Sequence, residues 1–303
     1  MKHVDLRGLS VAVATPFDRA GEVDLPAFRA VCRRIVDGGA DVLVPLGSTG
    51  EAAVLEDAER GPLIAAALAE SRGRPVMVGC GSNSTRTAAR YVREAAAAGA
   101  AAALVVTPYY NKPGVEGLVA HYAAVAAAAP GFPLVVYNVP GRTGINLTPA
   151  ALARLWSHPQ IVAVKESSGN LAQIGEIART LPPGKLLLAG DDQLALASIA
   201  VGARGLVSVV GNVRPAETKR LVDAALAGDA ETARRVHGEL LPLMDALFLE
   251  SNPIPVKAAL ALEGLGLALA EVQRRGLRDE DRRRHPLGAH ARGDARLPER
   301  ARP

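Results

Sequence analysis

The chain has 303 residues, of which 49% are hydrophobic and 22% are charged, a composition typical of one large globular domain or two small ones. Its formal net charge of +4 arises after residue 270, because residues 271–303 hold ten arginines and six acidic side chains while residues 1–270 are balanced. A basic character confined to one end of the chain argues against a nucleic-acid-binding surface.

The sequence also lacks the usual marks of a membrane, disulfide-bonded or metal-binding protein. No apolar run is long enough to cross a bilayer, and the first eight residues have no apolar signal core. Cys32 and Cys80 stand in a helix-like and a strand-end context, and the six histidines show no metal-ligand spacing. We therefore expect a cytoplasmic protein that uses no metal.

Strand-like and helix-like segments alternate along the chain. The expected strands are residues 9–17, 41–46, 75–78, 102–107, 133–138, 161–164, 185–189 and 205–210. The expected helices are residues 25–36, 57–71, 85–98, 115–129, 148–157, 171–181, 193–201 and 214–227. This alternation predicts a (β/α)8 TIM barrel. A doubly wound open sheet is the alternative, but residues 14–17 (Ala-Thr-Pro-Phe) are not the glycine-rich turn that such a sheet places after its first strand.

Two more helical segments, residues 230–249 and 255–262, follow the last strand and helix. They predict a C-terminal helical extension, so that the chain divides into a barrel over residues 1–227 and a helical segment over residues 228–265. Residues 266–303 mix arginine, acidic residues, glycine and proline with little apolar content. We expect this arginine-rich tail to be weakly ordered.

The sixth expected strand ends in a lysine. Residues 161–164 are apolar without alternation, as in a strand buried on both faces of a parallel sheet, and Lys165 follows directly. Burial disfavours the charged form of a lysine, and a free amine on a rigid strand can attack a ketone to give a Schiff base that acts as an electron sink. The alternative is a strand-end lysine whose ammonium lies in solvent.

Other strand ends carry polar or aromatic side chains, and a (β/α)8 barrel gathers such residues at one mouth. Residues 47–51 (GSTGE) offer two hydroxyls and a glycine-rich backbone suited to a small carboxylate. Residues 107–113 (TPYYNKP) carry Tyr110, and residues 137–144 (YNVPGRTG) carry Tyr137 and Arg142. A phenol can relay protons, and a guanidinium can bind a carboxylate through two hydrogen bonds. Each motif alone fits an ordinary turn or packing residue, but their convergence with Lys165 favours a catalytic site.

These three motifs, the later VAVKESSGN and NPIPVK, and their order along the chain carry a family resemblance. Over about residues 9–262 the chain resembles the dihydrodipicolinate synthase / N-acetylneuraminate lyase family. The resemblance implies a (β/α)8 fold and a class I aldolase mechanism, in which a lysine forms a Schiff base with pyruvate or another 2-oxo acid and no cofactor takes part.

The resemblance implies four catalytic residues. Lys165 would form the Schiff base, Tyr137 would relay protons above it, and Ser48 would link Tyr137 to Tyr110, which reaches in from a neighbouring subunit. Ser48 departs from the threonine usual in the synthase branch, although it keeps the hydroxyl. The assembly implied is a homotetramer, a dimer of dimers.

The same resemblance implies the residues that bind substrate. Thr49 and Gly50 would hold the pyruvate carboxylate, Arg142 would receive the carboxylate of L-aspartate 4-semialdehyde, and Val207 would complete the site. The lyase branch lacks this arginine, so Arg142 favours a synthase that forms 4-hydroxy-tetrahydrodipicolinate in lysine and diaminopimelate biosynthesis.

Two alternatives stay open from the sequence, together with one further departure. The first alternative is another 2-oxo acid aldolase of the same family, acting on a sugar acid or on 4-hydroxy-2-oxoglutarate, and the second is a non-catalytic relative. Feedback-inhibited synthases bind lysine through a glutamate and histidines, whereas Thr87, Asp57 and Arg60 stand at the matching positions here. We therefore expect that lysine does not inhibit this protein.

Overall fold

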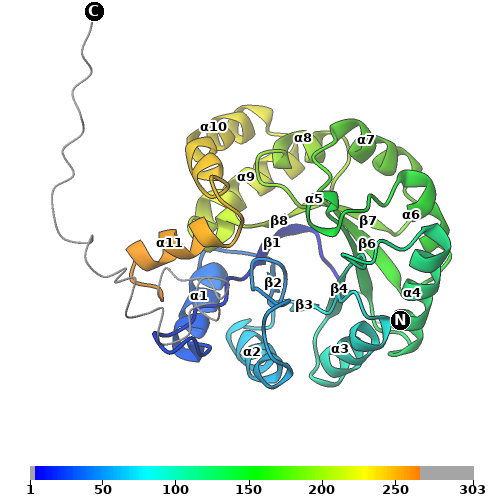
Figure 1. Ribbon diagram of the computed structural model, residues 1–303. Coiled ribbons are helices and arrows are strands. Elements are labelled where there is room, and N and C mark those ends of the chain that lie inside the picture. Colours follow the sequence, from blue (N-terminus) through cyan, green and yellow to red (C-terminus); the bar gives the residue numbers. More distant parts are fainter. Residues whose placement is uncertain (1–3, 267–303) are drawn as a thin grey trace, which may run out of the picture.

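The computed structural model describes residues 4–266. Its eight parallel strands form one sheet in the order β2-β1-β8-β7-β6-β5-β4-β3, and a parallel bridge between Leu43 and Val76 joins the two ends of this order. The strands are β1 (Gly8–Ala12), β2 (Val42–Val44), β3 (Met77–Gly79), β4 (Ala102–Val106), β5 (Leu134–Asn138), β6 (Ile161–Glu166), β7 (Leu186–Ala189) and β8 (Gly205–Ser208). Helices surround the strands in Figure 1, and the predicted (β/α)8 barrel is confirmed.

The helices follow the strands much as the sequence predicts. They are α1 (Leu25–Asp37), α2 (Asp57–Glu70), α3 (Thr85–Ala97), α4 (Val115–Ala127), α5 (Pro140–Thr143), α6 (Pro149–Leu155), α7 (Leu171–Thr180), α8 (Ala195–Ala200) and α9 (Pro215–Ala227). Asp24, Ser84, Thr148 and Asn170 each cap a helix by accepting a hydrogen bond from the backbone N–H three residues on. Neither α5 nor a 3-10 turn at Val210–Asn212 was predicted from the sequence, because segments this short show no helical period.

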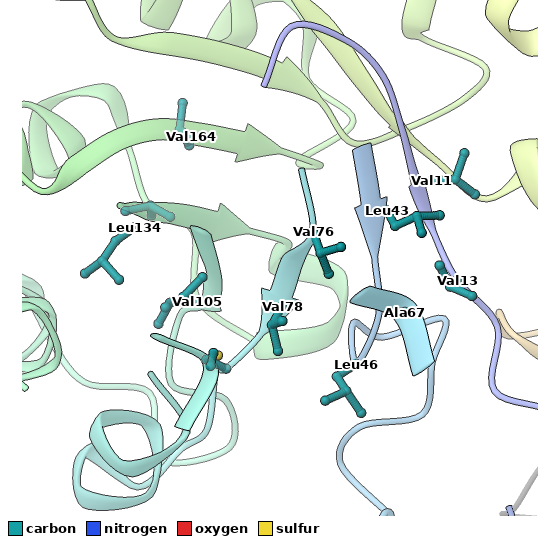
Figure 2. Packing of buried hydrophobic residues seen from close by; sticks show 14 of the residues in the cluster. Val11, Val13, Leu43, Leu46, Ala67, Val76, Val78, Val105, Leu134 and Val164 are labelled. Atoms are coloured by element: carbon teal, nitrogen blue, oxygen red, sulfur yellow. The ribbon is translucent and has the colours of Figure 1, made fainter. Parts of the chain in front are cut away.

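Side chains alternate between the two faces of each strand. Those pointing outward form the larger apolar cluster with the helices, and Figure 2 labels Val11, Leu43, Val105 and Val164 among its members. Those pointing inward fill the barrel with apolar groups from all eight strands, among them Ala12, Val44, Met77, Leu104, Leu188 and Val207. Lys165 lies two residues beyond the inward-facing Ala163, and Tyr137 lies two residues beyond the inward-facing Val135. Both side chains are therefore held at the carboxyl end of the barrel interior.

The C-terminal extension consists of α10 (Ala230–Ala246) and α11 (Ile254–Leu262). An apolar cluster of its own joins these helices to α9 and to the turn after β8: Val210, Val213, Leu221, Val236, Leu240, Met244 and Val256. In Figure 1 α11 lies beside α1, and Glu263, which follows α11, pairs with Arg34 of α1. The domain boundaries after residues 227 and 265 stay predictions, and the tail expected over residues 266–303 lies outside the described residues from 267 onward. No described helix is both long and apolar enough to cross a membrane.

Candidate active site

Lys165 and Tyr137 form the centre of the candidate site. They are the penultimate residues of β6 and β5, and they are direct partners in the pairing of these two strands. The Lys165 Nζ atom lies 4.2 Å from the centroid of the Tyr137 ring, and each side chain is only 6% exposed. Neighbouring strands thus hold an amine and a phenol together in a largely dry space, as the sequence predicts.

The space around Lys165 depends on a glycine that the sequence analysis did not select. Gly190 follows β7, and a Cβ atom there would lie 1.9 Å from Ser167 Oγ and 2.8 Å from Lys165 Cε. Any other residue would displace the lysine side chain. The Ser167 hydroxyl is itself buried and has no hydrogen-bond partner within residues 4–266. The signal for Gly190 was its place directly after the seventh strand, next to the sixth.

A cavity of about 230 Å³ opens beside Tyr137 at the barrel mouth. It brings together three of the predicted residues, Ser48, Tyr137 and Arg142, and is also lined by Leu46, Gly47, Glu51, Gly79, Leu104, Val106, Tyr109 and Thr143. Its lining is largely apolar, and its polar side chains are two hydroxyls, two phenols, a carboxylate and a guanidinium, which suits a small polar ligand that must be oriented.

The loop that carries Ser48 has a strained and close-packed backbone. Leu46 and Glu51, at its two ends, have positive φ angles of 61° and 55°, which cost free energy in residues other than glycine and are found most often at functional sites. Within it, a Cβ at Gly50 would lie 3.1 Å from both the Val13 carbonyl oxygen and the Leu46 nitrogen. The Thr15 hydroxyl donates to the Gly50 carbonyl at 2.8 Å. The loop is therefore fixed against the segment that follows β1 before any ligand binds.

Asn252, which lies between α10 and α11, joins two predicted substrate-binding residues. Its Nδ2 donates to Thr49 Oγ1 at 2.9 Å, and its backbone oxygen accepts from Arg142 Nη2 at 2.7 Å. Five residues on, Lys257 of α11 forms an ion pair of 2.6 Å with Glu51, and the two side chains are 2% and 4% exposed. This segment carries the NPIPVK motif of the family resemblance, but the motif alone predicts no role for it in the site.

Five of the eight predicted residues do not line the cavity. Lys165 lies against the Tyr137 ring, and Thr49 and Gly50 directly follow Ser48, which leaves Val207 and Tyr110. Val207 faces the barrel interior within the same apolar cluster as Tyr137 and is 1% exposed, but it does not line the cavity. Tyr110 is 87% exposed and has a φ angle of 73°, whereas its neighbour Tyr109 lines the cavity. Within one chain the structure thus brings Tyr109 to the site and directs Tyr110 outward.

The three residues compared with a lysine-binding site lie on α2 and α3. Arg60 is buried, stacks on the Tyr91 ring at 3.6 Å and donates to the Gly79 carbonyl at 2.7 Å; burial lowers its pKa. Asp57 accepts hydrogen bonds from Arg90 at 2.7 Å and from the Tyr91 hydroxyl at 2.8 Å, and both lower the pKa of its carboxyl. Thr87 is half-buried on α3, where its N–H donates to the Ser84 hydroxyl that caps the helix. Arg60 and Asp57 are thus already bound to groups of this chain.

No three His, Cys, Asp or Glu side chains among residues 4–266 are placed to hold a metal ion. The polar side chains at the mouth supply an amine, phenols, hydroxyls, a carboxylate and a guanidinium. An amine and a phenol held in contact suit the formation and protonation of an imine with a carbonyl compound.

Comparisons with known proteins show which family the chain belongs to. The model of the dihydrodipicolinate synthetase family matches residues 5–279. The chain is 46% identical to the 4-hydroxy-tetrahydrodipicolinate synthase of Syntrophus aciditrophicus over 259 residues, which are 85% of this chain and 88% of the relative. For the same enzyme of Thermomicrobium roseum the identity is 48% over 262 residues, 86% of each chain.

Solved structures give the same result. A dihydrodipicolinate synthase from Aquifex aeolicus superposes with a TM-score of 0.86 and 38% identity, over 92% of this chain and 95% of that one. The Acinetobacter baumannii enzyme in complex with pyruvate superposes with a TM-score of 0.85 and 35% identity, over 92% and 96%. A monomeric variant of the enzyme superposes equally well, at 0.85 and 38%, over 90% and 91%. By sequence and by structure, the chain belongs to the dihydrodipicolinate synthetase family.

Proposed function

We propose that this chain catalyses the 4-hydroxy-tetrahydrodipicolinate synthase reaction, the condensation of pyruvate with L-aspartate 4-semialdehyde in lysine and diaminopimelate biosynthesis. The observation that carries the proposal is the buried contact between the Lys165 amine and the Tyr137 ring at the barrel mouth. Relatives at 44–48% identity carry this enzyme's name, and a structural neighbour was solved with pyruvate. A cytoplasmic location is part of the proposal and rests on the sequence composition.

The chemistry begins at Lys165. Its amine attacks the ketone carbon of pyruvate, and loss of one water gives an imine that withdraws electrons from the adjacent methyl group. Removal of a methyl proton then forms an enamine, whose carbon attacks the aldehyde carbon of the semialdehyde. The semialdehyde's own amine finally displaces Lys165 from the imine carbon, which closes the ring and returns the free lysine. We assign the proton transfers to the Tyr137 phenol, with the Ser48 hydroxyl in reach of the same cavity.

Trapping and turnover together test this function. Incubation with pyruvate and borohydride should add one reduced pyruvyl group to the protein, and condensation should be fastest with L-aspartate 4-semialdehyde among a set of aldehydes. The set includes glyoxylate and sugar aldehydes, because these are the partners that the other aldolases of the family would use. A pyruvyl adduct with preferred turnover of one of those aldehydes would refute the substrate assignment, and no adduct would refute the mechanism.

Arg142 is proposed to bind the carboxylate of the aldehyde substrate. Its guanidinium lines the cavity and is oriented by the Asn252 carbonyl. Arg142→Ala should leave pyruvate trapping near the wild-type rate but lower kcat/KM for the semialdehyde about ten- to a hundredfold, since hydrogen bonds to charged groups contribute about 1.5–3 kcal/mol. Arg154→Ala, which breaks an ion pair with Glu116 on the outer surface, is the control and should change neither. Equal losses in trapping and condensation would contradict this division of roles.

We propose that Tyr110 completes the site of a neighbouring subunit in a homotetramer. The support is its exposure of 87% together with a positive φ angle, a conformation that costs free energy in a tyrosine and serves no contact with the cavity of its own chain. If so, mixing Tyr110→Phe with Lys165→Ala subunits should restore part of the activity that each homogeneous variant lacks. A monomeric structural neighbour exists, so the oligomeric state of the mixtures must be measured alongside. Mixed oligomers without recovered activity would count against the arrangement in trans.

Lysine is expected not to inhibit the enzyme. Thr87 supplies no carboxylate for the ligand's ammonium, while Arg60 adds a buried cation, and Asp57 is already paired with Arg90. The loss of one charge-assisted hydrogen bond weakens binding by about ten- to a hundredfold. Activity should therefore persist in millimolar L-lysine, and half-inhibition at a submillimolar concentration would show that these positions were misread. The solved relative from Cyanidioschyzon merolae, which contains bound lysine, shows that some members of the fold do bind it.

A further inference from the structure

Asn138 directly follows Tyr137, Glu166 directly follows Lys165, and these two residues also lie opposite each other on neighbouring strands. Asn138 ends β5, Glu166 ends β6, and they are partners in the strand pairing one step beyond Tyr137 and Lys165. Because successive side chains of a strand point to opposite faces, Asn138 and Glu166 lie behind the barrel wall, on the helix side. They are 0% and 1% exposed.

The two side chains are joined by hydrogen bonds that leave little freedom to either. Asn138 Nδ2 donates to both carboxylate oxygens of Glu166, at 2.9 and 3.2 Å. The other side of the amide, Oδ1, accepts from Leu147 N at 2.9 Å, and Glu166 Oε1 accepts from Ser168 N at 2.7 Å. Asn138 and Glu166 are thus each hydrogen-bonded to the loop that follows their own strand and also to each other across the two strands.

A buried carboxylate at this position is costly, and that cost argues for a role beyond packing. Burial raises the pKa of Glu166, while the hydrogen bonds from Ser168 and Asn138 act in the opposite direction. An apolar pair of similar volume would be at least as stable in such a place, but it would carry no directional bonds. A backbone hydrogen bond also joins the ends of the two strands, since Ser167 N donates to the Asn138 backbone oxygen at 2.9 Å.

We propose that Asn138 and Glu166 are a positioning pair that fixes the Lys165 amine relative to the Tyr137 phenol. Each shares a peptide unit with one of the two reactive residues, so a shift or twist between the ends of β5 and β6 would move the amine and the phenol apart. Reactive groups displaced by about 1 Å can lose a hundredfold in rate. The inference rests on the proposed function, because it assumes that Lys165 and Tyr137 act together on an imine.

A pair of inverted substitutions tests the proposal. In Glu166→Gln, an amide N–H can face the Asn138 N–H, and in Asn138→Asp two carboxylates face each other; each single variant should slow pyruvate trapping and condensation about ten- to a hundredfold. In the double variant Asn138→Asp/Glu166→Gln the carboxylate and the amide have exchanged places, so the donor–acceptor pairing is restored. We expect the double variant to recover most of the trapping rate, measured well below its melting temperature.

Asn212 offers a matched control on another side of the barrel. It is also 0% exposed, and its Nδ2 donates to the backbone oxygens of Ala12 and Val209 at 2.8 and 2.9 Å. Asn212→Asp should lower the melting temperature, as Asn138→Asp does, but leave the trapping rate of the folded protein unchanged. A structural role alone would make the two variants behave alike.

The outcomes separate this inference from the proposed function. Single variants that melt lower but trap pyruvate at the wild-type rate would overturn the positioning role, as would a folded double variant that stays slow. If a single variant does not fold, the double variant decides alone: recovery of both folding and trapping supports the pair, and folding without trapping refutes it. Failure of the proposed function would show instead in the wild-type protein, as no adduct or as preference for another aldehyde.

Discussion

Replacing Lys165 by alanine is expected to abolish the borohydride-stable pyruvate adduct and to lower condensation by roughly a thousandfold or more, because the substitution removes the amine that forms the imine. The fold should persist, since the change removes a side chain that is only 6% exposed from the mouth of the barrel and leaves the apolar interior below it in place. Intact-protein mass after borohydride reduction gives the first result, and circular dichroism with a melting curve gives the second.

Lys112→Ala is the control for that experiment. Lys112 belongs to the TPYYNKP segment, and its Cε lies against Gly144 at the end of α5, so it is another lysine of the barrel rim. This variant should still form the adduct at the wild-type stoichiometry. An adduct that persists in Lys165→Ala, and that peptide mapping places on a different lysine, would show that the reactive amine had been assigned to the wrong strand.

The sequence could predict those site residues that lie at the ends of recognisable strands. The apolar run before Lys165 marks a buried strand, and the order of strands and helices marks a barrel, which together place the lysine at the mouth. The side-by-side position of Tyr137 follows in the same way, because consecutive strands of a barrel are neighbours and both residues lie near the end of theirs. Local pattern and topology were sufficient for this pair.

The sequence could not predict the contacts between segments that are far apart in the chain. Glu51 and Lys257 are separated by 206 residues, and Thr49 and Asn252 by 203, so their pairing follows only from how the C-terminal extension returns to the mouth. No periodicity of α11 reveals which loop its lysine reaches.

The two adjacent tyrosines show a different limit. A positive φ angle at Tyr110 sends this side chain outward while Tyr109 lines the cavity. This is a property of one backbone turn, which composition does not determine.

Replacing Lys257 by methionine is expected to lower both stability and substrate binding. Lys257 Nζ lies 2.6 Å from a carboxylate oxygen of Glu51 and 4.0 Å from the centroid of the Phe17 ring, and both charged side chains are almost fully buried. Removing one member of a buried ion pair leaves the other charge uncompensated and costs about 3–5 kcal/mol, which corresponds to a fall in melting temperature of roughly 6–20 °C. The loop of residues 47–51 should also lose its anchor, so KM for pyruvate should rise.

Two further variants test whether the loss of stability comes from the unpaired buried charge. Glu51→Gln/Lys257→Met removes both charges and should be more stable than Lys257→Met alone, because the buried carboxylate is what makes the single variant costly. Lys219→Met is the control. It breaks an ion pair with Asp223 on the surface of α9, and such a pair contributes only about 0–1 kcal/mol to stability. If Lys257→Met has the melting temperature of the wild type, or if the double variant has a lower melting temperature than Lys257→Met, the ion pair does not hold the loop. In that case the anchoring of residues 47–51 would have to come from the Asn252 amide on Thr49 and from the Thr15 hydroxyl on Gly50.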